Sequence, residues 1–256
     1  LTLLDVLGLI YSQLGHTSKA EDCWLTTYSI LEFKAPQLRY LVQSYLGLAF
    51  VFLCSRDYET AEHLYMKALG LLQRFSQRYR NWFLRVYKGL TNLYAWQGKF
   101  TQAWAYLAAS IETITNDDLP SEVPELNLIR AELYYRESNF EQAEVICKST
   151  LETYKNSSPL VGSLYALLGD ISLKKGFLNE ARDYLTKALE LSRVVMMSQV
   201  ELSFIQQLKC EYNLAVSNYS EVVEDTEEWG ARPEPFHHAL KAYYHGLANY
   251  RMHNYD

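Results

Sequence analysis

The sequence contains few residues that interrupt regular secondary structure. Glycine and proline number only 11 and 6 among 256 residues. A β-sandwich requires turn residues every 8–12 positions or so, and this scarcity therefore argues against that class. Hydrophobic residues make up 49% of the chain, which is enough to form a buried core.

Signals for disulfide, metal and membrane chemistry are also missing. The four cysteines are Cys23, Cys54, Cys147 and Cys210. They form no C-x-x-C pair, so we expect reduced thiols rather than a zinc site, a redox pair or a disulfide framework. No apolar run is long enough to cross a membrane. The net charge of −6 does not indicate nucleic acid or a membrane surface as a partner.

The N-terminal residues lack the features of a targeting segment. The stretch Leu1–Asp5 has neither an initiator methionine nor a positively charged region, so we do not interpret it as a signal peptide. We expect a cytoplasmic fragment of a longer protein.

No motif of a known catalytic or metal site is present. The sequence contains no Gly-rich phosphate loop, no G-x-S-x-G elbow and no H-E-x-x-H pattern. His238 and His245 are seven positions apart, which corresponds to a rise of about 10 Å on a helix and is too far for shared ligation of one metal. We therefore expect no enzyme activity, no cofactor and no metal.

A short phrase recurs along the whole chain. A small or polar turn is followed by an aromatic residue in most copies, then by two or three mostly polar residues and an alanine, as in Asn139–Ala143 and Gly176–Ala181. The alanines are Ala20, Ala61, Ala103, Ala143, Ala181 and Ala215. Most of the intervals between successive alanines are close to about 40 positions, and this near-regularity indicates an internal repeat.

Two further positions keep a fixed distance from each alanine. The residues twelve positions earlier are mostly small: Gly8, Ala49, Thr91, Ala131, Gly169 and Ser203. The residues four positions later are mostly large or apolar: Trp24, Tyr65, Leu107, Cys147, Leu185 and Tyr219. This pattern predicts antiparallel helix pairs in which small residues on both helices allow close packing, and in which neighbouring pairs must stack to bury their apolar sides.

The order large–Leu–small–aromatic, turn, Ala–x3–aromatic resembles the tetratricopeptide repeat. Repeat one shows it in Leu4, Leu7, Gly8 and Tyr11, followed by Ala20 and Trp24. The resemblance implies an all-α, right-handed α-solenoid and one domain of six repeats with a partial seventh. The expected repeats are 1–35, 36–78, 79–119, 120–157, 158–194, 195–232 and 233–256.

Two features depart from the family pattern. The period of about 40 residues exceeds the usual period of about 34, and most units lack the closing proline. Long-period repeats of this kind resemble those of MalT-like transcriptional activators and kinesin-light-chain-like adaptors.

In this architecture the first helices of successive pairs line a concave groove. We predict that the faces of those helices left over from core packing bind a partner. The candidates are Phe50, Arg85, Lys88, Asn92, Trp96, Glu132, Tyr135, Arg136, Lys174, Phe204, Tyr243, Tyr244 and Arg251. Arg85, Lys88, Asn92 and Trp96 fall at steps of three and four, so they share one helix face that suits a ligand with an anionic and an apolar group. A solvated helix face with one partly buried tryptophan explains the same pattern.

Two features of the sequence bear on the kind of partner. Tetratricopeptide domains that clamp a chaperone C-terminus use a Lys-x3-Asn pair with further Asn, Lys and Arg residues, but Ile129, Ser163 and Leu167 hold the matching places here. We therefore reject that clamp. No acidic residue occurs between Glu62 and Glu112, a stretch that carries seven cations. Such a basic ridge would suit a phosphate backbone, but we expect it to meet an acidic protein surface or a neighbouring acidic repeat instead.

The sequence thus predicts a non-catalytic, protein-binding scaffold whose partner is a peptide or protein, with an acidic partner suggested by the basic stretch. One alternative is a ligand-sensing or regulatory segment of a larger signalling protein such as a MalT-like regulator. A second alternative is a helical arm attached to an enzyme such as a protease.

Overall fold

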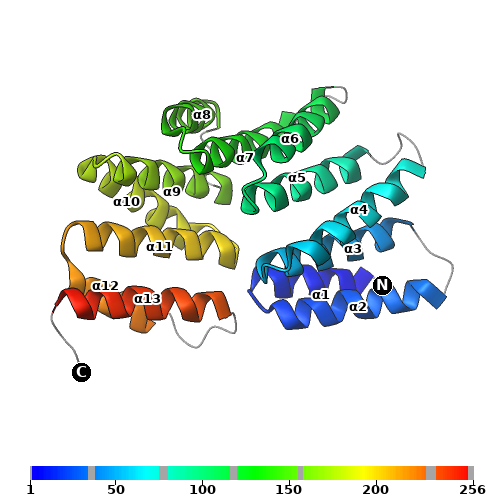
Figure 1. Cartoon of the computed structure of the whole chain (residues 1–256), viewed down its shortest axis with the longest axis horizontal. Helices are drawn as coiled ribbons and strands as arrows, with labels where there is room; N and C mark the ends of the chain where they lie inside the picture. Colours follow the sequence, from blue (N-terminus) through cyan, green and yellow to red (C-terminus); the bar gives the residue numbers. More distant parts are fainter. Residues whose placement is uncertain are drawn as a thin grey trace. The chain divides into compact units, whose positions relative to one another are not determined.

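The computed structural model describes residues 2–33, 38–74, 80–115, 120–154, 158–228 and 235–252. Within these ranges the chain forms thirteen α-helices, one short 3-10 helix and no strand (Figure 1). The α-helices are α1 (Thr2–Gln13), α2 (Thr17–Phe33), α3 (Leu38–Cys54), α4 (Tyr58–Arg74), α5 (Arg80–Trp96), α6 (Phe100–Thr115), α7 (Val123–Arg136), α8 (Phe140–Thr153), α9 (Pro159–Lys174), α10 (Leu178–Val194), α11 (Gln199–Ala215), α12 (Tyr219–Glu228) and α13 (Pro235–Arg251). The 3-10 helix η2 (Pro120–Glu122) precedes α7. The predicted all-α class is confirmed.

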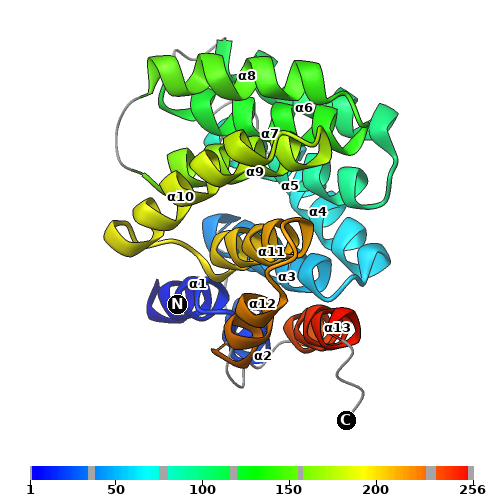
Figure 2. The same ribbon diagram turned by 90° about the vertical axis from the view of Figure 1, so that its left-hand side faces the viewer.

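The helices belong to two compact units, Leu1–Ala143 and Glu144–Asp256, which are described separately below. In unit 1 the pairs α1/α2, α3/α4 and α5/α6 pack as hairpins, and each second helix also contacts the next first helix. In unit 2 the hairpin α9/α10 follows the same rule, and its two helices lie side by side in both views (Figure 2). The expected single array over residues 1–256 stays a prediction.

The hairpin turns that the structure describes share one backbone geometry. One residue in each of these turns has a positive φ: Gly15, Arg56, Gly98, Ser138, Gly176 and Ser217. At each of these the amide bonds to a carbonyl three residues back, and the next amide bonds to a carbonyl five residues back, as in Gly98 N to Ala95 O and Lys99 N to Tyr94 O. This is the Schellman motif, which satisfies the last carbonyls of the first helix and reverses the chain. The equal turns explain the regular period of the sequence.

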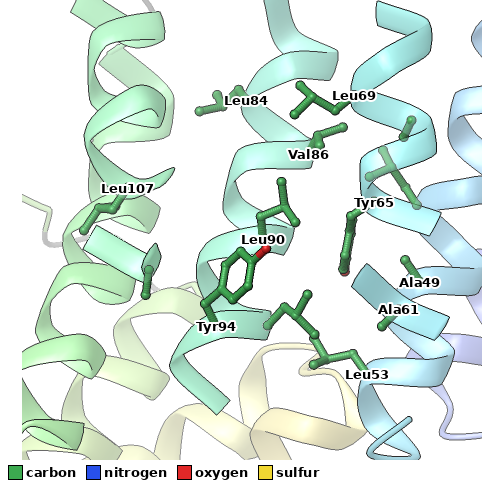
Figure 3. Packing of buried hydrophobic residues seen from close by; sticks show 14 of the residues in the cluster. Ala49, Leu53, Ala61, Tyr65, Leu69, Leu84, Val86, Leu90, Tyr94 and Leu107 are labelled. Carbon is green, nitrogen blue, oxygen red and sulfur yellow. The ribbon is translucent and has the colours of Figure 1, made fainter. Parts of the chain in front are cut away.

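The predicted small residues form the contact between the two helices of a hairpin. Ala20, Ala61, Ala103 and Ala143 are fully buried, and Ala181 is 1% exposed. Figure 3 shows Ala61 of α4 facing Ala49 of α3, with Tyr65 directed from α4 towards α5. Because neither alanine has a side chain beyond Cβ, the two backbones approach closely and the large neighbours fill the sides.

Glycines of the following first helix make room for these large residues. A Cβ atom on Gly47 of α3 or Gly89 of α5 would overlap the rings of Trp24 and Tyr65, respectively. Trp24 also lies against Gly8 of α1, where an added Cβ would lie 2.7 Å from Cε2. Trp24 is therefore a wedge between the first and second hairpins, and Tyr65 occupies the same place one repeat later.

The predicted phase of the sixth repeat is wrong. Ala215 is the last residue of α11 and does not lie in a second helix. The turn lies at Ser217, and the buried position of the second helix is Val222. Cys210 twelve residues earlier and Thr226 four residues later are also fully buried. Counted from Ala181 to Val222, the sixth repeat regains the long period of the preceding ones.

Prolines stand at the start of several described helices. Ser158 caps α9 by accepting from the Val161 amide, and Pro159 follows as the first helical residue. Pro124 lies in the first turn of α7, and Pro235 begins α13. The link at Ala35–Pro36 lies outside the described residues. No helix in the described ranges is both long enough and apolar enough to span a bilayer.

Candidate functional site

Four first helices of unit 1, namely α1, α3, α5 and α7, contribute side chains to one groove with a volume of about 310 Å³. Its lining residues are Leu9, Ser12, Gln13, Trp24, Gln43, Leu46, Gly47, Phe50, Leu53, Tyr65, Arg85, Lys88, Gly89, Asn92, Glu125 and Ile129. Four of the predicted site residues, Phe50, Arg85, Lys88 and Asn92, are among them. The repeat register thus brings together residues from successive repeats that are far apart in sequence.

Part of the groove lining is apolar. Leu9 of α1 is 40% exposed and Phe50 of α3 is 37% exposed, although both are large hydrophobic residues. Leu46 and Ile129 lie deeper and are buried. Exposed apolar side chains above a buried floor can take a hydrophobic group from a ligand and gain free energy from its removal from water.

The lining also contains amide and guanidinium groups. Arg85 Nη1 donates to Gln43 Oε1 at 2.8 Å, and the guanidinium lies 4.8 Å from the ring centroid of Trp82. Partial burial lowers the pKa of Arg85, while the nearby carboxylates of Glu125 and Glu122 act in the opposite direction. The side-chain amide of Asn92 makes no hydrogen bond within the described part of the chain, so it can bind the backbone of a ligand.

Lys88 is paired with two carboxylates. Its Nζ lies 2.6 Å from Glu125 Oε2 and 3.0 Å from Glu122 Oε2, and only 13% of its side chain is exposed. Glu122 ends η2 and Glu125 lies in the first turn of α7, so the pairs join α5 to the next repeat. The cation predicted to bind an anionic ligand is thus already neutralised by its own chain.

The remaining predicted residues of unit 1 lie beside the groove. The Arg136 guanidinium lies 5.6 Å from the Trp96 ring centroid, and Trp96 is 38% exposed. The Tyr135 ring packs against Phe140 at a centroid distance of 5.6 Å. None of Trp96, Tyr135 and Arg136 is among the groove-lining residues. Trp96 and Arg136 therefore form a cation–π contact with each other. This contact fits the interpretation of a partly buried tryptophan on a solvated helix face.

Glu132 of α7 has a pKa far from its ordinary value. Burial raises the pKa of Glu132 from its usual 4.5 to about 7, against the opposing charge of Arg136. The folded chain therefore retains this proton between about pH 4.5 and 7, where the unfolded chain has lost it. Stability must fall as the pH rises through that window and stay reduced above it.

We expect Glu132→Gln to remove this pH-dependent loss. At pH 8 the free energy of unfolding of the variant should exceed that of the native sequence by about 1–2 kcal/mol, so the variant is more stable. At pH 4 the two free energies should be equal. The side chain is partly exposed, which keeps the figure below the full value of the shift. Urea unfolding at both pH values measures it, with Glu190→Gln on the exposed face of α10 as control. An equal difference at pH 4 and pH 8 would contradict the assignment.

The described cations of the predicted basic ridge have partners within the chain. Lys67 lies 6.0 Å from the Tyr45 ring centroid, and Lys99 lies 5.8 Å from that of Tyr94. Arg85 and Lys88 face the groove, where carboxylates are close. Arg78 lies outside the described residues, and the side chains of Arg74 and Arg80 are not described. Each described cation of the stretch is thus engaged by a ring, an amide or a carboxylate.

Unit 2 carries the other predicted residues. A hollow of about 740 Å³ is lined by Leu173, Lys174, Gly176, Leu178, Glu211, Leu214, Ala215, Tyr243 and Tyr244. Lys174 pairs with Glu211 at 3.0 Å, and the Tyr244 hydroxyl donates to the other oxygen of Glu211. Tyr243 is 61% exposed, whereas Tyr244 is 4% exposed and belongs to the core. Phe204 packs against the core of α9–α11, and Arg251 is exposed at the end of α13.

Among the described residues no cluster of His, Cys, Asp and Glu has the makings of a metal site. His245, which the sequence singled out, places Nδ1 2.9 Å from the Thr226 hydroxyl. This contact joins α12 to α13. The side chain of His238 is not described.

Sequence reasoning missed Glu122 and Glu125. Glu125, Arg85 and Gln43 each precede the alanine of their own repeat by the same number of positions, so the register contained the signal for Glu125. Glu122 ends the 3-10 helix η2 in the link before α7, and no sequence pattern identifies it.

The comparisons with known proteins identify the repeat type. The tetratricopeptide repeat family matches residues 162–194, which lie in α9 and α10. No curated protein matches the chain in sequence.

Solved structures match almost the whole chain. A tetratricopeptide repeat protein from Parabacteroides merdae has a TM-score of 0.64 and 14% identity, with 96% of this chain and 83% of that chain covered. BtubC (BKLC) from P. vanneervenii has a TM-score of 0.57 and 17% identity over 95% and 92% of the chains. The Cut9–Hcn1 hetero-tetramer of APC/C has a TM-score of 0.58 and 13% identity over 95% of this chain and 50% of that one. The chain therefore carries a tetratricopeptide repeat at residues 162–194 and has the tetratricopeptide-repeat fold.

Proposed function

We propose that the groove of unit 1 binds an extended segment of a partner protein, and that the chain acts as a non-catalytic interaction scaffold. The observation that carries this proposal is the groove itself, to which the predicted residues Phe50, Arg85, Lys88 and Asn92 all contribute. A groove that crosses several first helices suits a chain segment better than a compact small molecule.

The chemistry of the lining supports the same conclusion. Leu9 and Phe50 provide exposed apolar surface. Asn92 and Gln43 provide amides in the same lining, and an amide can donate to a backbone carbonyl and accept from a backbone amide. This combination can bind a peptide backbone through hydrogen bonds and one of its side chains through apolar contact.

One of the matched structures supports a protein as the partner class. The Cut9 structure is a hetero-tetramer with Hcn1, so a protein of this fold assembles with a second protein there. We extend only the class of partner to this chain.

The proposal is tested with peptides selected by the native chain from a random display library. Phe50→Ala should weaken binding of the selected peptides about tenfold, because it removes the apolar anchor of the groove. Leu25→Ala is the matched control, since Leu25 is 45% exposed on α2 and does not line the groove. Fluorescence anisotropy measures both affinities. Equal binding by both variants, or a library that yields no binder, would refute the groove.

A further inference from the structure

Four charges lie together at the unit 1 groove, and three of them belong to its lining. Arg85 and Lys88 are the cations, and Glu122 and Glu125 are the anions. The two carboxylates contact Lys88 directly and also act on the charge of Arg85. The cluster therefore has no net charge although two of its members are cations.

The arrangement leaves little positive potential for a ligand. The Lys88 side chain is 13% exposed, and its two anionic neighbours, at 2.6 Å and 3.0 Å, come from the next repeat. A ligand carboxylate that approaches Nζ meets the repulsion of Glu122 and Glu125 at nearly the same distance. It would also lose hydration on entering the groove. The other cation of the described lining, Arg85, already donates to Gln43 and lies near the same two carboxylates.

A cationic ligand is disfavoured for the complementary reason. Arg85, Lys88 and Glu125 all line the groove, and the two cations would repel such a ligand while the 52% exposed carboxylate of Glu125 is screened by water. The uncharged groups that remain for a partner include the exposed side chains of Leu9, Phe50 and Gln13 and the partly buried amide of Asn92.

We propose that Glu122 and Glu125 determine the specificity of the groove by masking Lys88, so that it selects uncharged, apolar segments and rejects acidic ones. This inference rests on the proposed function of the groove. It revises the acidic partner suggested by the basic stretch of the sequence, because that expectation counted Lys88 as an available cation. Selectivity here comes from a repulsive element rather than from an added attractive contact.

The test compares peptide selections on two forms of the whole chain. The native chain and a Glu122→Gln/Glu125→Gln variant are each used to select from the same random display library. The native chain should yield apolar peptides without enrichment of Asp or Glu. The variant should yield acidic peptides that bind it at least about fivefold more tightly than they bind the native chain. High salt should remove most of this difference.

A second variant, Glu59→Gln/Glu141→Gln, loses the same number of charges at exposed positions of unit 1 outside the groove. It should select the same peptides as the native chain. Thermal unfolding followed by circular dichroism verifies that all three forms are folded. Acidic peptides selected by the native chain, or identical selections by the native chain and the groove variant, would overturn the inference while the groove still binds peptides. No selected peptide for any form would refute the proposed function and this inference with it.

Discussion

Replacement of Trp24 by alanine should lower the free energy of unfolding of unit 1 by about 3–5 kcal/mol. The indole is 1% exposed and packs between Gly8 of α1 and Gly47 of α3, within a cluster that includes Ala20 and Val51. Its Nε1 has no hydrogen-bond partner in the described part of the chain, so the loss arises from packing and the resulting cavity. Urea unfolding followed by circular dichroism provides the measurement.

Gly47 supplies an internal control for this wedge. Gly47→Ala should destabilise the native sequence, because the new Cβ overlaps the Trp24 ring. In the Trp24→Ala background the same change should cost much less, since the obstructing ring is gone. Additive effects of the two substitutions, or a loss below about 1 kcal/mol for Trp24→Ala, would show that the wedge does not hold the first two hairpins together.

Replacement of a buried alanine between the two helices of a hairpin should have the next largest effect on the free energy of unfolding. Ala61 is fully buried in α4 and faces Ala49 of α3 (Figure 3). Ala61→Leu adds three carbon atoms where the backbones are closest, and we expect a loss of up to about 3 kcal/mol in the free energy of unfolding.

The control for Ala61→Leu is the same exchange at Ala108, which is exposed on α6. Ala108→Leu should change stability by less than about 0.5 kcal/mol. A shift in the melting temperature of the same size for both variants would mean that close helix contact at Ala61 is not required.

The fold was predictable because its determinants are local and recur. An alanine in the second helix and a turn of fixed geometry appear once in nearly every repeat, and both are visible in sequence. The sixth repeat was misplaced for a physical reason. Ala215 follows the aromatic Tyr212 by three positions, as the alanines of other repeats follow their aromatic residue, so the pattern placed the turn before Tyr212 although it lies at Ser217. The sixth repeat also has Val222 in place of the alanine that marks the other copies.

The groove was predictable only in part. The repeat register located Phe50, Arg85 and Asn92 on one face, because equivalent positions of successive first helices are neighbours. The state of Lys88 was not predictable, because its partners are 34 and 37 positions away and one of them lies in the short helix η2. The sequence analysis did not identify Gly47 and Gly89 as the glycines that make room for Trp24 and Tyr65, although they occupy the same position in successive repeats.

The hairpin turns also bear on how quickly the chain reaches its folded state. Each described turn is closed by amide–carbonyl bonds that span no more than five residues, and the helices it joins are neighbours in sequence. Chain closure over such short separations loses little entropy, so a hairpin can nucleate at any of several points and extend to its neighbours. We therefore expect low contact order and rapid refolding, with separate nucleation sites competing along the chain.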